Sequence, residues 1–340
     1  MDNVNLKTLA EELNLAVSTV SRALRDNHEI SQETKDRVKA LAAKLGFQPN
    51  PYASSLRQNK SRTIAVVIPE IQNNFFSQVM NGVEEVAQQK GYHVLIYLTH
   101  EDHNRERDIL KVLRNGRVDG LMISVSNSTT NLEHLESYRQ TGTPLVFFDR
   151  VCEDMDVPCV TTDDSKAAFK ATEHLLKMGC KQIAFLSLSC NLSISSGRRT
   201  GYLKALAKYG LDNEMIIECG VDDETNRAHI RQLLQSEPRP DGIFAAVENF
   251  AVNTYEVCHD MNISIPRQLK LVGFSNLSAA ALFDPPLSTI VQPAYEIGKE
   301  AATILFKIIE KKILLPNERK VTIASQIVER KSTGNYKRQH

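Results

Sequence analysis

Apolar residues recur every three or four positions through residues 1–47, and this spacing predicts three helices. The first predicted helix carries its apolar residues on one face: Leu6, Leu9, Ala10 and Leu13. A tight turn is expected at Asn14, because asparagine tolerates the left-handed backbone conformation. A second short helix is expected at about 17–25, and Ser31 is placed to cap a third.

The pattern changes after residue 62, where short aliphatic runs begin to alternate with helical stretches. The predicted strands are 64–68, 93–98, 120–125, 145–148, 182–186, 242–247 and 269–274. Runs of this kind are typical of a parallel sheet buried on both faces. A new strand–helix series begins around Val160–Asp163, which predicts a change of lobe. Ligands of such sheets bind at the carboxyl ends of the strands, so a cleft between two lobes is the expected site.

The predicted fold is therefore a two-lobed α/β domain preceded by a small all-α helix-turn-helix domain. The expected bounds are 1–48 for the helical headpiece, 49–62 for a hinge helix and linker, and 63–340 for the core. Within the core, the first lobe is expected at about 63–161 plus 292–320, and the second at about 162–291 plus 321–334.

Composition adds little to this picture. Formal net charge is zero, and residues 1–62 hold ten basic against seven acidic side chains, an excess that an ordinary solvated surface also shows. The six cysteines form no Cys-x-x-Cys pair, which favours free thiols in a reducing compartment. Neither a signal peptide nor a bilayer-spanning stretch is recognisable. We expect a cytoplasmic, nucleoid-associated protein with no membrane partner.

The second helix carries the clearest candidate chemistry. Opposite its apolar face, four polar or basic residues follow helical spacing: Ser18, Ser21, Arg22 and Arg25. Arginine can bridge two acceptors of guanine in the major groove, and hydroxyl groups can reach phosphate oxygens. The alternative that remains open at this point is the solvated face of an ordinary three-helix bundle.

Several longer stretches resemble the LacI/GalR family of bacterial transcriptional regulators. They are Leu6–Glu11, Ser18–Leu24, Ile30–Thr34 and Leu45–Asn50 in the headpiece, and Ile327–Thr333 near the end of the chain. The resemblance therefore covers nearly the whole length. It implies a type I periplasmic-binding-protein-like core, and a homodimer in which each recognition helix reads one half-site of a palindromic operator.

The resemblance also implies DNA-contacting roles at matching positions. The candidate DNA-binding residues are Leu6, Val17, Ser18, Thr19, Ser21, Arg22, Asn50, Ala53 and Leu56. Leu56 matches the hinge-helix leucine that family members wedge into the minor groove; packing of this leucine against the core is the alternative. Ala16 departs from the family, which usually has serine before the recognition helix, and the missing cap costs about 1 kcal/mol of local helix stability.

Four patches of the core resemble the family's effector site: Asn73–Phe76, Phe148–Arg150, Arg198–Tyr202 and Val272–Asn276. The candidate effector-binding residues are Asn73, Phe75, Phe76, Asp149, Arg150, Arg198, Glu248, Ser275 and Asn276. Aromatic rings with carboxylate and guanidinium groups suit a sugar or sugar derivative, including an acidic or phosphorylated one. Core packing of one phenylalanine and a structural Asp149–Arg150 ion pair are the alternatives. Glu248 and Ser275 stand where the family usually has aspartate, so the effector's identity stays open.

Enzymatic and metal-binding roles find little support. His100–His103 includes two histidines, but no further ligands are spaced to close a metal site, and the start of a solvated helix is expected instead. Phosphate-loop, nucleophile-elbow and zinc-protease motifs are missing. We therefore expect no enzyme, cofactor or metal, and a repressor of sugar-utilisation genes. A regulator of non-sugar metabolism and an exported solute-binding protein are the alternatives.

Overall fold

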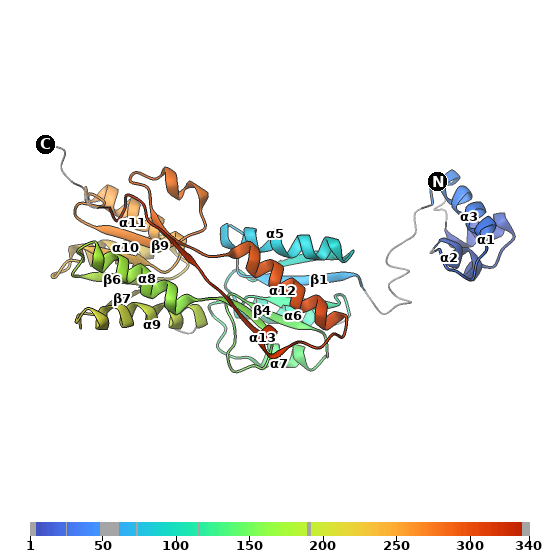
Figure 1. Ribbon diagram of the computed structural model, residues 1–340, viewed down its shortest axis with the longest axis horizontal. Helices are drawn as coiled ribbons and strands as arrows, with labels where there is room; N and C mark the ends of the chain where they lie inside the picture. Colours follow the sequence, from blue (N-terminus) through green and yellow to red (C-terminus); the bar gives the residue numbers. More distant parts are fainter. Residues whose placement is uncertain are drawn as a thin grey trace. The chain divides into compact units, whose positions relative to one another are not determined.

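The computed structural model of the chain describes residues 5–24, 26–47, 61–72, 74–114, 116–188 and 192–334. The chain divides into two compact units, Met1–Lys60 and Ser61–His340 (Figure 1). Among the described residues, every helix is too short or too polar to cross a membrane.

The first unit is a three-helix bundle, formed by α1 (Leu6–Leu13), α2 (Val17–Leu24) and α3 (Gln32–Lys44). Asn14 adopts the predicted left-handed conformation with φ of 51°, and its backbone N–H donates to carbonyls of α1. The Ser31 hydroxyl accepts the backbone N–H of Thr34 and caps α3, as predicted. The core of the bundle consists of Leu9, Ala10, Val20, Ala23, Val38 and Ala42.

The second unit begins with a six-stranded, wholly parallel sheet in the order β11-β5-β4-β3-β1-β2. Its strands are β1 (Thr63–Ile68), β2 (His93–Leu98), β3 (Gly120–Ile123), β4 (Leu145–Phe148), β5 (Cys159–Thr162) and β11 (Lys320–Ile323). One face packs on α5 (Asn74–Gln89) and α12 (Ala294–Ile309) (Figure 1). The other packs on α6 (His103–Leu113) and α7 (Glu133–Arg139). A short helix, α13 (Pro316–Arg319), precedes β11.

The second lobe repeats this plan in the order β12-β10-β9-β8-β6-β7, with only β12 antiparallel to its neighbour. Its strands are β6 (Ile183–Ser187), β7 (Met215–Glu218), β8 (Gly242–Ala245), β9 (Lys270–Phe274), β10 (Ser288–Val291) and β12 (Gln326–Val328). The helices are α8 (Asp164–Lys177) and α9 (Ser193–Lys208) on one face and α10 (Asp223–Gln235) and α11 (Glu248–Asp260) on the other; the 3₁₀ helix η1 (Ser278–Leu282) lies between β9 and β10.

The strand pattern of the sequence identified seven strands and missed five others: β5, β7, β10, β11 and β12. Each of the five has only three or four residues, and β7, β11 and β12 lie at sheet edges where side chains are partly exposed. Such strands lack the continuous apolar run by which buried strands are recognised. The expected return to the second lobe at residue 321 was wrong, because β11 pairs with β5 and keeps the chain in the first sheet through Ile323.

In each lobe, the helix pair on one face meets at a glycine. A Cβ atom on Gly298 of α12 would lie 2.1 Å from the Val79 carbonyl oxygen of α5, and one on Gly201 of α9 would lie 2.2 Å from the Ser165 carbonyl oxygen of α8. Both neighbours are backbone atoms, so they cannot swing away. The two helix pairs therefore approach closely only because these positions lack a side chain.

Replacing Gly298 by alanine is expected to lower the free energy of unfolding by about 3 kcal/mol, the upper end of the overpacking range, since α5 and α12 must separate. Urea denaturation of the two proteins measures this difference. Gly220→Ala is the matched control: its Cβ would have no heavy atom within 4 Å, so a change within about 0.5 kcal/mol is expected. Equal stabilities of the Gly298 variant and the parent would contradict the packing argument.

Candidate functional site

The exposed face of α2 is the first candidate site. Val17 is 39% exposed, and Ser18 and Arg22 are also exposed on this helix, while Thr19 and Leu6 are half-buried. Ala16 has no side-chain oxygen to cap α2, although its carbonyl accepts the backbone N–H groups of Thr19 and Val20. The helix thus presents a valine, a serine and an arginine together at its surface.

Ser21 does not belong to this exposed face. Ser21 is only 8% exposed and lies beside Val20 and Ala23 in the core of the bundle. The expectation that it faces outward was wrong, because α2 packs against both α1 and α3 and little of its circumference is left free. The polar stripe is therefore narrower than helical spacing alone suggested.

Arg22 forms a surface ion pair with Glu29, with 2.9 Å between Nη1 and Oε2. Both side chains are more than half exposed, so the pair contributes little stability. The guanidinium can therefore leave Glu29 for a stronger bidentate partner at small cost. Among the other DNA-binding candidates, Asn50, Ala53 and Leu56 lie outside the described residues, as does the effector candidate Asn73.

The second candidate site is a narrow cleft between the two lobes of the core, with a cavity volume of about 30 Å³. Eight effector-binding candidates line it: Phe75, Phe76, Asp149, Arg150, Arg198, Glu248, Ser275 and Asn276. Four residues outside the list of candidates join them: Ile194, Val247, Gln292 and Phe274, of which Phe274 lies within the predicted patch Val272–Asn276. The structure thus brings together residues more than 200 positions apart, because most of them follow the carboxyl ends of parallel strands or begin helices.

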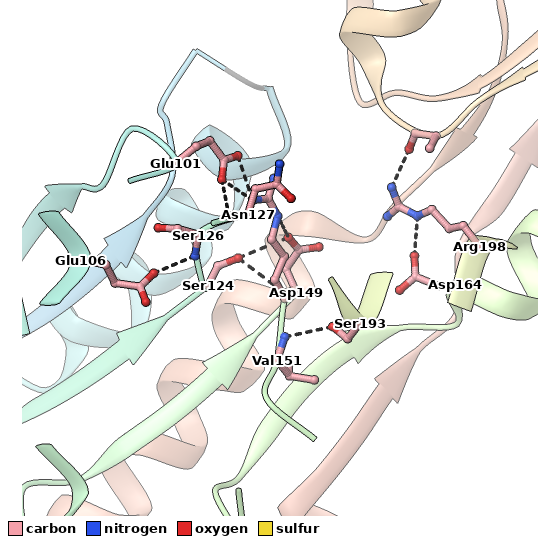
Figure 2. Close-up of polar contacts among 12 residues, drawn as sticks. Glu101, Glu106, Ser124, Ser126, Asn127, Asp149, Val151, Asp164, Ser193 and Arg198 are labelled. Carbon is pink, nitrogen blue, oxygen red and sulfur yellow. Dashed lines mark hydrogen bonds and ion pairs between the residues drawn. The ribbon is translucent and has the colours of Figure 1, made fainter. Parts of the chain in front are cut away.

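Arg198 is almost completely buried in this cleft. Its Nε donates to Asp164 Oδ1 at 2.7 Å, and its Nη1 donates to the Ala246 carbonyl oxygen at 2.6 Å (Figure 2). The guanidinium carbon lies 3.7 Å from the centre of the Phe274 ring, which is a cation–π contact. These contacts fix the plane of the guanidinium.

Arg150 also has a carboxylate partner, Glu101. The two Glu101 carboxylate oxygens lie 2.8 and 2.9 Å from Arg150 Nη1. His100 and Glu101 both have positive φ, and this tight turn after β2 directs the Glu101 carboxylate inward, where Asn127 N–H also donates to it (Figure 2). The expected solvated helix start at 100–103 was wrong for Glu101, whose side chain is 14% exposed. The Arg150 Nε is buried and makes no hydrogen bond to the described part of the chain.

Excess carboxylate is the main electrostatic property of the cleft. Burial raises the pKa of Asp164 to about 6, although the Arg198 guanidinium opposes this shift; the charge of Asp149 adds to it. Burial likewise raises the pKa of Asp149, against the opposing effect of Arg150 and Arg198. Each arginine already has a carboxylate partner, Asp149 forms a second, longer pair with Arg150 at 3.9 Å, and Glu248 pairs with neither arginine.

The two positions at which the sequence departs from the expected pattern, Glu248 and Ser275, contact each other. Glu248, at the start of α11, accepts a 2.7 Å hydrogen bond from the Ser275 hydroxyl, which follows β9. Its second oxygen accepts from the Asn74 amide of α5 at 3.0 Å. Glu248 therefore links Ser275 of the second lobe to Asn74 of the first lobe.

Two other hydrogen-bonded contacts join the lobes. Gln78 of α5 and Asn276 exchange hydrogen bonds of 3.2 and 3.4 Å, and the Val151 N–H donates to the Ser193 hydroxyl at 3.1 Å (Figure 2). Single polar contacts of this kind break at small cost in water, since each contributes about 1 kcal/mol net. These polar contacts can therefore be exchanged at small cost, while buried apolar residues of both lobes belong to one cluster.

Comparison with known proteins agrees with this architecture. Residues 5–50 match the family described as bacterial regulatory proteins, lacI family, and residues 61–337 match periplasmic binding proteins and sugar binding domain of LacI family. The ribose operon repressor of Halalkalibacterium halodurans is 31% identical over 328 residues, 96% of this chain and 96% of that protein.

Two solved structures share the fold. The Lac repressor dimer bound to operator and the anti-inducer ONPF matches with a TM-score of 0.85 and 20% identity, over 98% of this chain and 99% of that chain. A periplasmic binding protein/LacI transcriptional regulator from Alkaliphilus metalliredigens, complexed with D-xylulofuranose, matches with a TM-score of 0.71 and 25% identity, over 81% of this chain and 100% of that chain.

A helix-turn-helix headpiece followed by a two-lobed binding domain defines a DNA-binding transcriptional regulator. This chain belongs to the LacI family of bacterial regulatory proteins. The sequence pattern found most of the cleft but missed Glu101 and Asp164, the carboxylates that hold the two arginines. Only their contacts in the folded chain identify them.

Arg198→Lys is expected to lower the free energy of unfolding by about 3 kcal/mol, because a lysine cannot reproduce the paired, planar contacts to Asp164, Ala246 and Phe274. Chemical denaturation measures the change. The neighbouring Arg199 serves as the control: it is half-exposed and its nearest carboxylate, on Glu214, is 4.0 Å away. If Arg198→Lys and Arg199→Lys lower the free energy of unfolding by similar amounts, the Arg198 contacts do not stabilise the fold as argued.

Proposed function

We propose that this protein is a repressor of sugar-utilisation genes that binds a palindromic operator as a homodimer and responds to a sugar bound between its lobes. The convergence of Phe75, Phe76, Asp149, Arg150 and Arg198 in one cleft carries the proposal. Aromatic rings cover the apolar faces of a sugar, while carboxylates and planar guanidinium groups bond pairs of hydroxyls.

The exposed face of α2 supports the DNA-binding part. Val17 and Arg22 are free to approach base edges, and one such helix from each subunit fits the two half-sites of a symmetric operator. The Lac repressor, whose fold this chain shares, is a dimer bound to operator. Leu56 is assigned to the operator centre by family resemblance.

The charge of the cleft refines the ligand class toward neutral sugars. Glu101 and Asp164 already pair with the arginines, and two more carboxylates line the cleft. An acidic or phosphorylated sugar would add negative charge where burial already raises the pKa of two aspartates. One relative is named a ribose operon repressor, and another was solved in complex with D-xylulofuranose. Both sugars are pentoses, so pentoses are the first candidates to test.

A regulator of non-sugar metabolism with the same architecture is the second candidate. It is favoured by one observation: Ser275 and Glu248 replace the aspartate pattern that the family usually shows, so the hydroxyl-binding geometry differs. Binding of a nucleobase or amino acid, with no sugar bound, would select this alternative.

Isothermal titration of the full-length protein with pentoses and their phosphates tests the effector class. A neutral pentose is expected to bind at least about tenfold more tightly than its phosphate, since the cleft repels added negative charge. Glu248→Gln keeps the shape of the side chain but removes one charge, and it should narrow this preference. Glu256→Gln, an exposed substitution on the same helix, should leave it unchanged. Tighter binding of the phosphate would refute the charge argument.

The DNA-binding role is tested on an operator selected from random duplexes. Arg22→Ala is expected to weaken operator binding by about 1–3 kcal/mol and to relax preference at one base pair, the value of one bidentate base contact. Gel shifts over a range of salt concentrations measure both effects. Arg37→Ala, at an exposed position of α3, is the control and should leave sequence preference intact. If the Arg22 variant binds all duplexes more weakly by the same factor, then Arg22 contacts phosphate and does not read a base.

A further inference from the structure

Two side chains of α6 and one of α7 meet beside the first sheet, where the two helices pack together. His103 and Glu106 lie one turn apart on α6, and His134 lies in the first turn of α7. Each offers one metal-ligand atom, and these atoms all lie within 4.8 Å of one another. The two imidazole rings pack edge to face, with centroids 4.7 Å apart.

The Glu106 carboxylate is fully buried and has no lysine or arginine partner among the described residues. It accepts hydrogen bonds from the Ser126 backbone N–H at 2.7 Å, from the Thr129 hydroxyl at 2.9 Å and from His134 Nε2 at 2.7 Å. A buried carboxylate is stabilised by a cation, either a side chain or a metal. Among the described residues, the basic side chain that contacts this carboxylate is His134, and an ion bound beside the two residues would supply positive charge.

Both histidines also have an unused nitrogen. The Nδ1 atoms of His103 and His134 are buried and make no hydrogen bond to the described residues. The His134 side chain is only 5% exposed, so water does not readily reach its free nitrogen. Buried nitrogen atoms without partners are costly, and metal coordination is one way to satisfy them.

We propose that His103, Glu106 and His134 form a binding site for one divalent transition-metal ion of the zinc type. Two imidazoles and a carboxylate are a ligand set that zinc accepts, with a fourth position for water. Ligand atoms around tetrahedral zinc lie about 3.3 Å apart, so the three ligand atoms, which lie within 4.8 Å of one another, must move closer together when an ion binds. Magnesium and calcium prefer an all-oxygen set and fit these residues poorly.

A chain of hydrogen bonds connects this site to the cleft. Glu106 holds the backbone of Ser126, and the next residue, Asn127, donates its N–H to Glu101, which in turn holds Arg150 (Figure 2). The site also ties α6 to α7, two separate helices on the same face of the sheet. A bound ion would therefore fix Glu106 more firmly and, through Ser126 and Asn127, the Glu101 carboxylate that holds Arg150. This effect does not depend on which effector binds in the cleft.

Titration of metal-free full-length protein with Zn²⁺ against a chromophoric chelator tests the site. One Zn²⁺ per chain is expected, and His103→Ala should weaken binding by more than roughly 100-fold, the upper end of the loss caused by removing an outer-sphere partner. His103 is half-buried, so this variant is expected to fold. Co²⁺ should give visible ligand-field absorption in the parent protein and lose it in the variant.

His229→Ala is the matched control, because this exposed histidine of α10 lies in the other lobe. It should bind Zn²⁺ as the parent protein does. Equal Zn²⁺ affinity in the parent, His103→Ala and His134→Ala proteins would overturn the proposal, as would failure of the parent to bind. In either case, the cluster is a buried hydrogen-bond network in which Glu106 and His134 tie α6 to α7. Sugar and operator binding are measured separately, so this failure leaves the proposed repressor function standing.

Discussion

The buried guanidinium of Arg198 is the constraint on which the cleft depends. A charge with so little access to water is tolerable only when it is paired and hydrogen-bonded. Asp164 at the start of α8, the Ala246 carbonyl after β8 and the Phe274 ring at the end of β9 must therefore meet around α9. That requirement arranges the carboxyl edge of the second sheet, from which most of the cleft wall in this lobe is built.

Each lobe is held together by its own sheet and helix pairs, and polar contacts bridge the cleft between the lobes. Glycine contacts lock the helix pairs within a lobe, whereas direct polar contacts such as Asn74–Glu248 and Val151–Ser193 bridge the cleft. A ligand that adds contacts to both walls would shift the angle between lobes at little cost to either core. Coupling of this kind between two sites is typically worth about 1–3 kcal/mol, enough for regulation.

Much of the candidate site could be predicted from the sequence, because resemblance to a family carries positions as well as a fold. Phe75, Asp149 and Arg198 follow strands or begin helices at matching positions, and the structure places them in one cleft. The carboxylates of Glu101 and Asp164 could not be found this way. Their importance lies in contacts with Arg150 and Arg198, 49 and 34 residues away, and spacing along the chain does not report such pairs.

The sequence by itself determined the three headpiece helices, the turn at Asn14, the cap at Ser31 and the alternation of buried strands with helices. These are local properties: helical periodicity, a capping serine and a run of aliphatic residues act within a few positions of one another. Only the tertiary structure decided that Ser21 is buried, that β11 stays in the first sheet and that His134 reaches Glu106. Each depends on which surfaces pack together, and that is settled by the whole chain because burial and charge pairing act between segments far apart in sequence.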